Sequence, residues 1–280
     1  MRVVFFGSSR LVIPIIEILK LNFELVLVVT TERSKNDPVP FYCTNNQINY
    51  VSVGKTGDLI GANFFHEAMA EMGIVADFGL ILPEQILRVF PFGIINIHPS
   101  LLPKYRGPSP VQSAILNGDQ ETGVTIIKLD KQMDHGPIIV QEKAEITPGE
   151  TAQELYERLF KFGAQMLTDL SPKLESLMLH PLEQDHAAVT YTKPLTRDSG
   201  FVDFTKPIDK TIFGRMLLAY FPWPGVWSKI VLTGNGEKIV KFLPNKLIQV
   251  EGKNEMSYKD FINGYPNADK KLIEFLKREL

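Results

Sequence analysis

The stretch from 94 to 136 constrains the fold of this chain more than any other part of the sequence. It opens with a pair of isoleucines, typical of a buried strand, and then places Asn96 and His98 two residues apart. In a β-strand this spacing puts both side chains on the same face. Pro99 follows directly and ends the strand, because proline cannot donate a hydrogen bond to a sheet ladder. The pattern predicts a polar site at the carboxyl edge of an α/β sheet.

A carboxylate joins this pair from further along the same stretch. Apolar residues at helical spacing predict a helix over 108–117, and GVTIIKL predicts a strand over 123–129, so Asp134 has enough chain to return to the neighbouring strand. An amide N–H and an imidazolium N–H can point at one developing oxyanion, and a carboxylate can hold the imidazole charged or relay a proton. This set suits acyl transfer without a covalent enzyme intermediate. From the residues alone, a structural histidine and a solvated loop aspartate remain alternatives.

Alternating strand and helix patterns in the first part of the chain predict a doubly wound, mostly parallel Rossmann-like sheet of the α/β class. Strands are predicted over 3–6, 25–29 and 74–82, and helices through about Lys20 and over 58–72.

Two features of this part have open interpretations. The turn from Gly7 to Ser9 can cradle a phosphate at a helix N-terminus, and an ordinary tight turn explains it equally well. The stretch 31–57 is polar and punctuated by prolines, which predicts a loop. Only Arg33 and Lys35 are basic near its tip.

The pattern changes near residue 188. A long helix is predicted to about residue 170, and residues 189–250 then show short strands with glycine and proline turns, typical of a small β-barrel or sandwich. Residues 187–280 carry 15 lysines and arginines against 10 aspartates and glutamates, whereas residues 1–186 carry 15 against 22. We expect two domains, 1–188 and 189–280. A basic second domain is expected if it holds nucleic-acid phosphates, although an ordinary soluble surface also explains this surplus.

Cysteine usage and hydropathy exclude several classes of protein. The single cysteine, Cys43, cannot support a disulfide framework or a four-cysteine metal site, so a reducing compartment is expected. No apolar run reaches the length of a membrane span, and the first residues are typical of a strand entering a turn rather than of a signal peptide. We expect a cytoplasmic monomer with no membrane partner and no metal.

The motif NIHPSLLPKYRG, followed by GVTIIKLDKQMDHGPII, resembles the folate-dependent formyltransferases, and FFGSS and DFGLILPEQIL extend the agreement towards the N-terminus. Members of that family transfer a formyl group from 10-formyltetrahydrofolate to an amine. Their catalytic Asn, His and Asp match Asn96, His98 and Asp134. The resemblance further implies that two segments contact the folate, through Ile81, Leu82, Ser100, Leu101, Leu102 and Pro103.

The resemblance also bears on the acceptor amine. Lys104 and Arg106 are expected to face solvent near the acceptor, where the planar fork of an arginine can meet a phosphate. The stretch YTKPLTRDSGFVDFTKPIDKTIFGRMLLAYFPWPGVWSKI resembles the carboxyl-terminal, OB-like domain of methionyl-tRNA formyltransferases, a domain that single-domain glycinamide ribonucleotide formyltransferases lack. The resemblance therefore implies formyl transfer to initiator methionyl-tRNA, with 10-formyltetrahydrofolate as cosubstrate and no metal.

Two alternatives remain open. In methionyl-tRNA formyltransferases the counterpart of 31–57 is a longer, basic loop. Its low charge here favours an N-formyltransferase that acts on an amino-sugar nucleotide, although the second domain argues against that function. The other alternative is a non-catalytic tRNA-binding relative that keeps the fold, and the intact triad argues against it.

Overall fold

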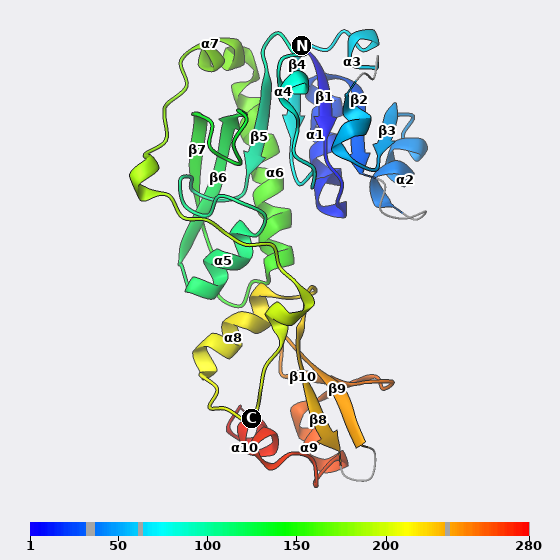
Figure 1. The fold of residues 1–280 in the computed structure, drawn as a ribbon, viewed down its shortest axis with the longest axis vertical. Coiled ribbons are helices and arrows are strands. Elements are labelled where there is room, and N and C mark those ends of the chain that lie inside the picture. The colour runs from blue at the N-terminus through cyan, green and yellow to red at the C-terminus, as the bar shows by residue number, and fades with distance from the viewer. Residues whose placement is uncertain (32–36, 61–63, 233–235, 280) are drawn as a thin grey trace. The chain divides into compact units, whose positions relative to one another are not determined.

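Figure 1 shows the fold of the chain in a computed structural model, which describes residues 1–31, 37–60, 64–232 and 236–279. The chain forms two compact units, each assembled from several stretches. Unit 1 comprises Met1–Pro110, Gln120–Glu145 and Leu155–Lys193, and unit 2 comprises Val111–Asp119, Ile146–Glu154 and Pro194–Leu280. The division after Lys193 lies slightly beyond the boundary expected at 188, because residues 190–193 hydrogen-bond to a loop of unit 1.

Unit 1 is built on a seven-stranded sheet with the order β3-β2-β1-β4-β5-β6-β7. The strands are β1 (Arg2–Phe6), β2 (Glu24–Thr31), β3 (Tyr50–Val53), β4 (Met72–Val75), β5 (Ile94–His98), β6 (Glu121–Lys128) and β7 (Ile138–Glu145). Neighbours from β3 to β5 pair in parallel, whereas β6 and β7 pair antiparallel, so the expected mostly parallel sheet is confirmed. The strand order reverses at β1 and β4, and open α/β sheets bind ligands beyond the carboxyl ends of the strands at such a point.

The long helix predicted to about residue 170 is confirmed as α6. The helices in this part of the chain are α1 (Ile13–Asn22), α2 (Pro38–Asn45), α3 (Phe64–Glu67), α4 (Glu84–Leu87), α5 (Pro110–Asn117), α6 (Ala152–Leu170) and α7 (Leu174–Leu179). Helix α6 approaches the sheet closely at Gly163, where an added Cβ atom would lie 2.4 Å from a side-chain atom of Ile97. Within the described ranges, no helix has the length and apolar character needed to cross a membrane.

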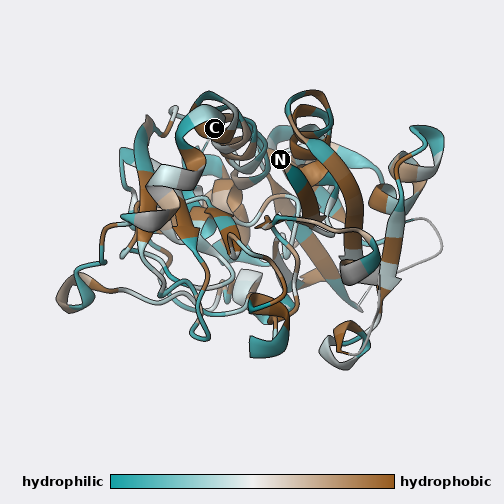
Figure 2. Ribbon diagram, turned by 90° about the horizontal axis from the view of Figure 1, so that it is seen from above, coloured by the Kyte–Doolittle hydropathy of each residue, from teal (hydrophilic) through white to brown (hydrophobic). Residues whose placement is uncertain are grey.

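Aromatic rings form much of the core of unit 1. Phe6, Phe65, Phe78 and Phe90 are buried, and the centroids of their contacting rings lie 5.4 to 6.2 Å apart. Figure 2 shows hydrophobic residues concentrated on the strands beside the N-terminus. Ser8 ties the turn after β1 to this core, because its hydroxyl donates to the Phe78 carbonyl at 2.8 Å and accepts the amide at the end of β2. The hydroxyl that was a candidate phosphate contact thus joins the end of β2 to the loop after β4.

The prediction of a single helix over 58–72 is wrong. That stretch holds a short 3-10 turn, α3 and the start of β4 among its described residues. Leu59 and Phe65 gave it an apolar spacing, but they belong to separate elements that pack into one cluster. The strand predicted over 74–82 is also too long. It ends before Asp77, whose φ of 45° lies in the left-handed region and is incompatible with a strand.

The stretch 31–57 is not a simple loop, because its described residues contain α2 and β3. Pro38 opens α2, where a fixed φ favours the first helical turn and a missing N–H costs nothing. Cys43 lies in this helix and is fully buried. Arg33 and Lys35, which were predicted near the loop tip, lie outside the described residues.

Unit 2 contains a four-stranded antiparallel sheet with the order β11-β10-β9-β8. Its elements are α8 (Lys210–Ala219), β8 (Val226–Leu232), β9 (Gly236–Leu243), β10 (Leu247–Val250), β11 (Glu255–Ser257), α9 (Tyr258–Gly264) and α10 (Lys270–Glu279). Phe204, Phe213, Phe242 and Phe275 pack together as its aromatic core. The β-structure expected in this part is confirmed: its described strands form one open antiparallel sheet, whereas a barrel or a sandwich was expected.

Candidate functional site

Strand β5 supplies the amide and the imidazole of the candidate site. Asn96 and His98 occupy alternate positions near the carboxyl end of β5, which lies between β4 and β6. His98 is buried and Asn96 is half-buried. Both side chains approach the same carboxylate, that of Asp134, so the predicted placement on one face of a strand is confirmed.

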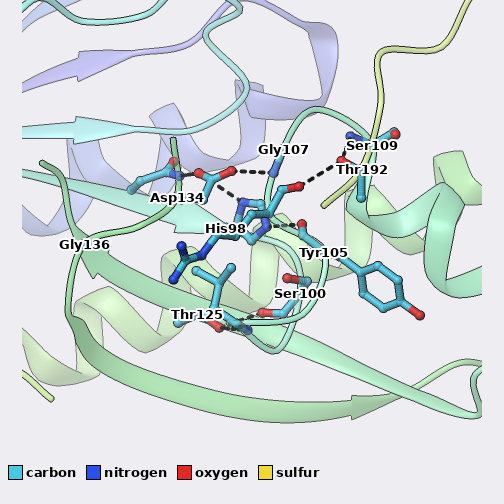
Figure 3. Close-up of polar contacts among 12 residues, drawn as sticks. His98, Ser100, Tyr105, Gly107, Ser109, Thr125, Asp134, Gly136 and Thr192 are labelled. Carbon is cyan, nitrogen blue, oxygen red and sulfur yellow. Dashed lines mark hydrogen bonds and ion pairs between the residues drawn. The ribbon is translucent and has the colours of Figure 1, made fainter. Parts of the chain in front are cut away.

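The carboxylate of Asp134 lies at the centre of the polar contacts in Figure 3. Its Oδ1 accepts a hydrogen bond from Asn96 Nδ2 at 3.2 Å and lies 3.6 Å from His98 Nδ1. Its Oδ2 accepts the backbone N–H of Gly107 at 2.7 Å. The fold therefore brings together the three residues that the sequence singled out, although 38 positions separate the first from the last.

His98 is held on both sides of its ring. Its Nε2 lies 3.1 Å from the carbonyl oxygen of Tyr105, and a carbonyl only accepts, so this nitrogen carries a hydrogen. Its Nδ1 faces Asp134, and protonation of Nδ1 creates a charge-assisted contact there. In the protonated ring, the Nδ1–H and the amide N–H of Asn96 both point towards Asp134 Oδ1.

Asp134 reaches β5 by a route that the sequence did not predict. Strand β6 runs antiparallel to β5, so the chain leaves β6 beside the amino end of β5, where Leu129 N donates to Ile94 O at 2.8 Å. The following loop folds back towards Asn96, and Asp134 takes a positive φ of 49° within it. Gly136 permits this fold, because a Cβ atom there would lie 1.9 Å from the carbonyl oxygen of Lys128.

A cavity of about 340 Å³ opens beside the three residues. Its apolar lining comes from β4 with the loop that follows it, from α4 and from α6, and includes Val75, Phe78, Leu80, Leu87, Tyr156 and Phe160. Asn96, His98 and Asp134 supply polar groups to the same lining. An apolar slot with a few convergent polar groups is the usual way in which a protein holds a flat heterocycle.

The residues predicted to contact folate separate into two groups. Ile81 and Leu82 line the cavity, Ile81 largely exposed and Leu82 buried. The four residues from Ser100 to Pro103 are absent from the described lining. The chain turns away from the cavity after Pro99, and Ser100 is fully buried with its hydroxyl donating to the carbonyl of Lys104 at 2.7 Å. This hydrogen bond closes a turn in the chain that follows β5.

The two basic residues of the same segment also differ from each other. Lys104 is exposed, as predicted. The prediction that Arg106 faces solvent is wrong, because its side chain is 1% exposed. Its guanidinium group donates to Gln184 Oε1 from Nε at 3.1 Å and from Nη2 at 2.6 Å, and Nη2 also contacts His186 Nδ1 at 2.9 Å. A guanidinium bound in this way has no open side for a phosphate.

Sequence reasoning missed several residues at the site. Tyr156 and Phe160 lie one turn apart on α6 and line the cavity, whereas the apolar pattern of α6 drew attention to the residues beside them. Gln184 contacts the Asp134 loop from a connection of no regular structure, so no periodicity could reveal it. In the described part of the chain, no three His, Cys, Asp or Glu side chains are grouped to hold a metal ion.

Known proteins resemble this chain over most of its length. Residues 1–170 match the family model described as formyl transferase. A methionyl-tRNA formyltransferase of Chloroflexus aurantiacus is 36% identical over 237 residues, which cover 81% of this chain and 76% of that protein. The methionyl-tRNA formyltransferase of Wolbachia pipientis subsp. Culex pipiens is 31% identical over 305 residues, covering 98% of this chain and 100% of that protein.

Solved structures agree on the fold. The crystal structure of a 4-N formyltransferase from Francisella tularensis has a TM-score of 0.68 to this chain at 20% identity, and the match covers 88% of this chain and 98% of the other. At that level of identity the likeness shows the fold alone.

Proposed function

The chain belongs to the formyl transferase family, and on that premise we propose that it transfers the formyl group of 10-formyltetrahydrofolate to the amino group of methionyl-initiator tRNA. Two relatives named for that activity support the choice of acceptor. The Wolbachia protein aligns over its whole length with 98% of this chain, and the alignment therefore includes most of unit 2. A relative limited to the catalytic unit would not support this acceptor.

One geometric observation carries the proposed chemistry: the amide of Asn96, the imidazole of His98 and the carboxylate of Asp134 converge beside an apolar cavity. Formyl transfer to an amine develops negative charge on the formyl oxygen, and fixed donors aimed at such an oxygen are commonly the largest contribution to catalysis. Asn96 donates one amide N–H to Asp134, and its second N–H bonds to no described residue, so it can point at the oxyanion. Protonated His98 supplies positive charge close by.

Asp134 has two roles in this scheme. Its carboxylate lies 3.6 Å from His98 Nδ1 and stabilises the protonated ring. It also accepts a proton from the attacking amine once the new C–N bond has formed, which allows the proton to pass towards the departing nitrogen. The cosubstrate supplies an activated formyl group whose bond to nitrogen breaks in this step, so no covalent enzyme intermediate is needed.

The apolar cavity supports the binding of such a cosubstrate. We propose that the backbone at Ile81 and Leu82 contacts the polar edge of the pterin, while the apolar walls cover its faces. Ser100 to Pro103 would then act by supporting the loop rather than by direct contact. Lys104 is the remaining basic candidate for contact with the acceptor.

Catalysis and contact with tRNA would belong to different parts of the chain. We propose that residues 1–188 form the catalytic domain and that 189–280, with the surplus of positive charge noted above, provide an OB-like domain that faces tRNA phosphates. The protein would act as a cytoplasmic monomer.

The proposal is tested by measuring which acceptor receives the formyl group. The full-length protein is incubated with labelled 10-formyltetrahydrofolate and either charged initiator methionyl-tRNA or a panel of amino-sugar nucleotides, and formylated product is measured. Rapid transfer to the tRNA alone supports the proposal. Transfer only to a sugar amine would keep the chemistry and overturn the acceptor, and no transfer with bound folate would point to a non-catalytic relative.

A Lys104→Ala variant refines the test. Because Lys104 is exposed and outside the cavity lining, its loss should raise KM for tRNA while kcat and the KM for folate remain close to their original values.

A further inference from the structure

Gln184 is a buried side chain whose amide is fully used in holding the loop that carries Asp134. Its Nε2 donates to two backbone carbonyls, that of Asp134 at 2.9 Å and that of Gly136 at 2.7 Å. Its Oε1 accepts both hydrogen bonds from Arg106. Gln184 is 4% exposed, so water does not replace these contacts. Gln184, Arg106 and the loop that carries Asp134 belong to three separate stretches of unit 1.

Arg106 connects the side-chain amide of Gln184 to the Oδ2 side of the Asp134 carboxylate. Its backbone N–H donates to Thr190 O at 2.9 Å, and its carbonyl accepts Thr192 N at 2.7 Å. The next residue, Gly107, donates its N–H to Asp134 Oδ2 at 2.7 Å. The segment from Gln184 to Thr192 therefore fixes both the main chain and the carboxylate of Asp134.

A second connection holds the same loop nearer to β6. His186 contacts Arg106 through Nδ1, and its ring stacks on that of His135 with a centroid distance of 4.4 Å and an interplanar angle of 11°. His135 Nδ1 in turn lies 2.6 Å from Asp130 Oδ2. The loop from Asp130 to Gly136 is thus held at its start and at its end.

The loop needs such support because its conformation is unfavourable by itself. Asp134 has a positive φ, which is strained for a residue other than glycine and persists only where surrounding contacts impose it. A small displacement matters at this site, because misplacing a reacting group by about 1 Å can lower a rate by roughly 100-fold.

We propose that Gln184 is a positioning residue that sets the location of the Asp134 carboxylate against Asn96 and His98. The inference rests on the proposed function for its kinetic consequence, and its structural part stands on the hydrogen bonds alone. Gln184 does not line the cavity, so it acts through Asp134 rather than on a substrate.

Gln184→Glu is the informative substitution, because it keeps the shape and the acceptor for Arg106 but replaces the NH2 donor with an oxygen. Two carbonyl oxygens would then face a carboxylate oxygen, and the loop must move. We expect kcat to fall by roughly 100-fold with the KM for folate within about twofold. Gln184→Asn keeps the amide but shortens its reach, and serves as the second variant if the first folds poorly.

The matched control is Gln249→Glu. Gln249 also donates its side-chain amide to a backbone carbonyl, that of Lys253 at 3.1 Å, but it lies in unit 2 on β10. The same chemical change there should leave kcat unaltered.

Two readouts separate positioning from general stability. In a double-mutant cycle, Gln184→Glu should cost much less in the Asp134→Asn background than in the wild type, since both changes act through one carboxylate. Hydrogen exchange should show faster exchange in residues 130–137 of Gln184→Glu, with unit 2 unchanged. Additive rate effects, or unaltered exchange in that loop, would overturn the positioning role. If the wild type formylates no acceptor, the proposed function fails while the exchange experiment still decides the role of Gln184.

Discussion

Asp134 gathers its contacts from residues far apart in sequence, and each contact depends on a different property of the side chain. A carboxylate can accept from Asn96 and Gly107 and still balance the charge of protonated His98. An amide in its place would keep one acceptor oxygen and lose the charge. Replacing Asp134 with Asn therefore removes the negative charge while it leaves the volume of the side chain nearly unchanged.

We predict that Asp134→Asn lowers the rate of formyl transfer by about 100-fold or more, because general acid–base assistance contributes on the order of 100- to 10,000-fold. The free energy of unfolding should change little, since the amide can still accept the Gly107 N–H. Single-turnover kinetics and chemical denaturation measure the two quantities. A fully active Asp134→Asn variant would remove Asp134 from the mechanism.

Cys43 shows how burial alone alters a titratable group. Burial raises the pKa of its thiol from 9.0 to about 11. The native state therefore keeps the proton at pH values where the unfolded chain has lost it, and the thiol adds stability that is complete below pH 9 and declines as pH rises towards 11. We predict slow alkylation of the native protein at pH 8 and rapid alkylation in urea.

The Cys43→Ala variant isolates this effect, because buried tyrosines also titrate at high pH. Its free energy of unfolding should fall less steeply than that of the wild type between pH 9 and 11. Equal slopes would show that Cys43 does not titrate as its burial implies.

At the scale of elements, the site depends on a loop between two antiparallel strands as much as on β5. The loop after β6 can cross back towards Asn96 only because Gly136 lies against the carbonyl of Lys128. Helix α8 gives a contrasting case in unit 2. Its Gly214 has open space where a Cβ would be, and the helix is capped by Asp209, which accepts Ile212 N at 2.9 Å.

These two glycines give a paired prediction of opposite sign. Gly136→Ala should destabilise the protein by about 1 to 3 kcal/mol and lower the rate, since the added methyl forces the Asp134 loop to move. Gly214→Ala should stabilise it by about 0.5 to 1 kcal/mol without altering kcat, because alanine favours a helix interior. Thermal or chemical unfolding gives the stabilities, and an equal effect of both substitutions would contradict the packing at Gly136.

At the scale of the whole molecule, charge is unevenly divided along the chain. Residues 187–280 hold 15 basic and 10 acidic residues, whereas the part before them holds 15 and 22. A partner rich in phosphate is attracted to residues 187–280 and repelled by residues 1–186. The charge distribution therefore favours one orientation of a nucleic acid.

We predict that the KM for methionyl-tRNA rises several-fold or more between about 50 and 200 mM salt, because binding of phosphates releases counterions. The KM for 10-formyltetrahydrofolate should change far less, since the proposed folate cavity is mainly apolar. Steady-state kinetics at several salt concentrations test both. Two KM values with the same salt dependence would argue against a tRNA contact through the basic region.

The sequence by itself determined the sheet class, the long helix α6 and the candidate triad. Periodicity and turn residues act over short distances, so Asn96 and His98 could be assigned to one face of a strand from their spacing alone. Such signals failed where elements are short: the apolar positions around Leu59 and Phe65 imitate one helix although they belong to different elements.

Only the tertiary structure decided how distant segments meet. It brought Asp134 to Asn96 across an antiparallel strand, buried Arg106 against Gln184, and turned Ser100 away from the cavity. The first two of these outcomes have no local cause, because each arises when two segments that are tens of residues apart satisfy one another's hydrogen bonds out of water. A sequence pattern records which residues can make such bonds, and the packing of the chain selects the partner.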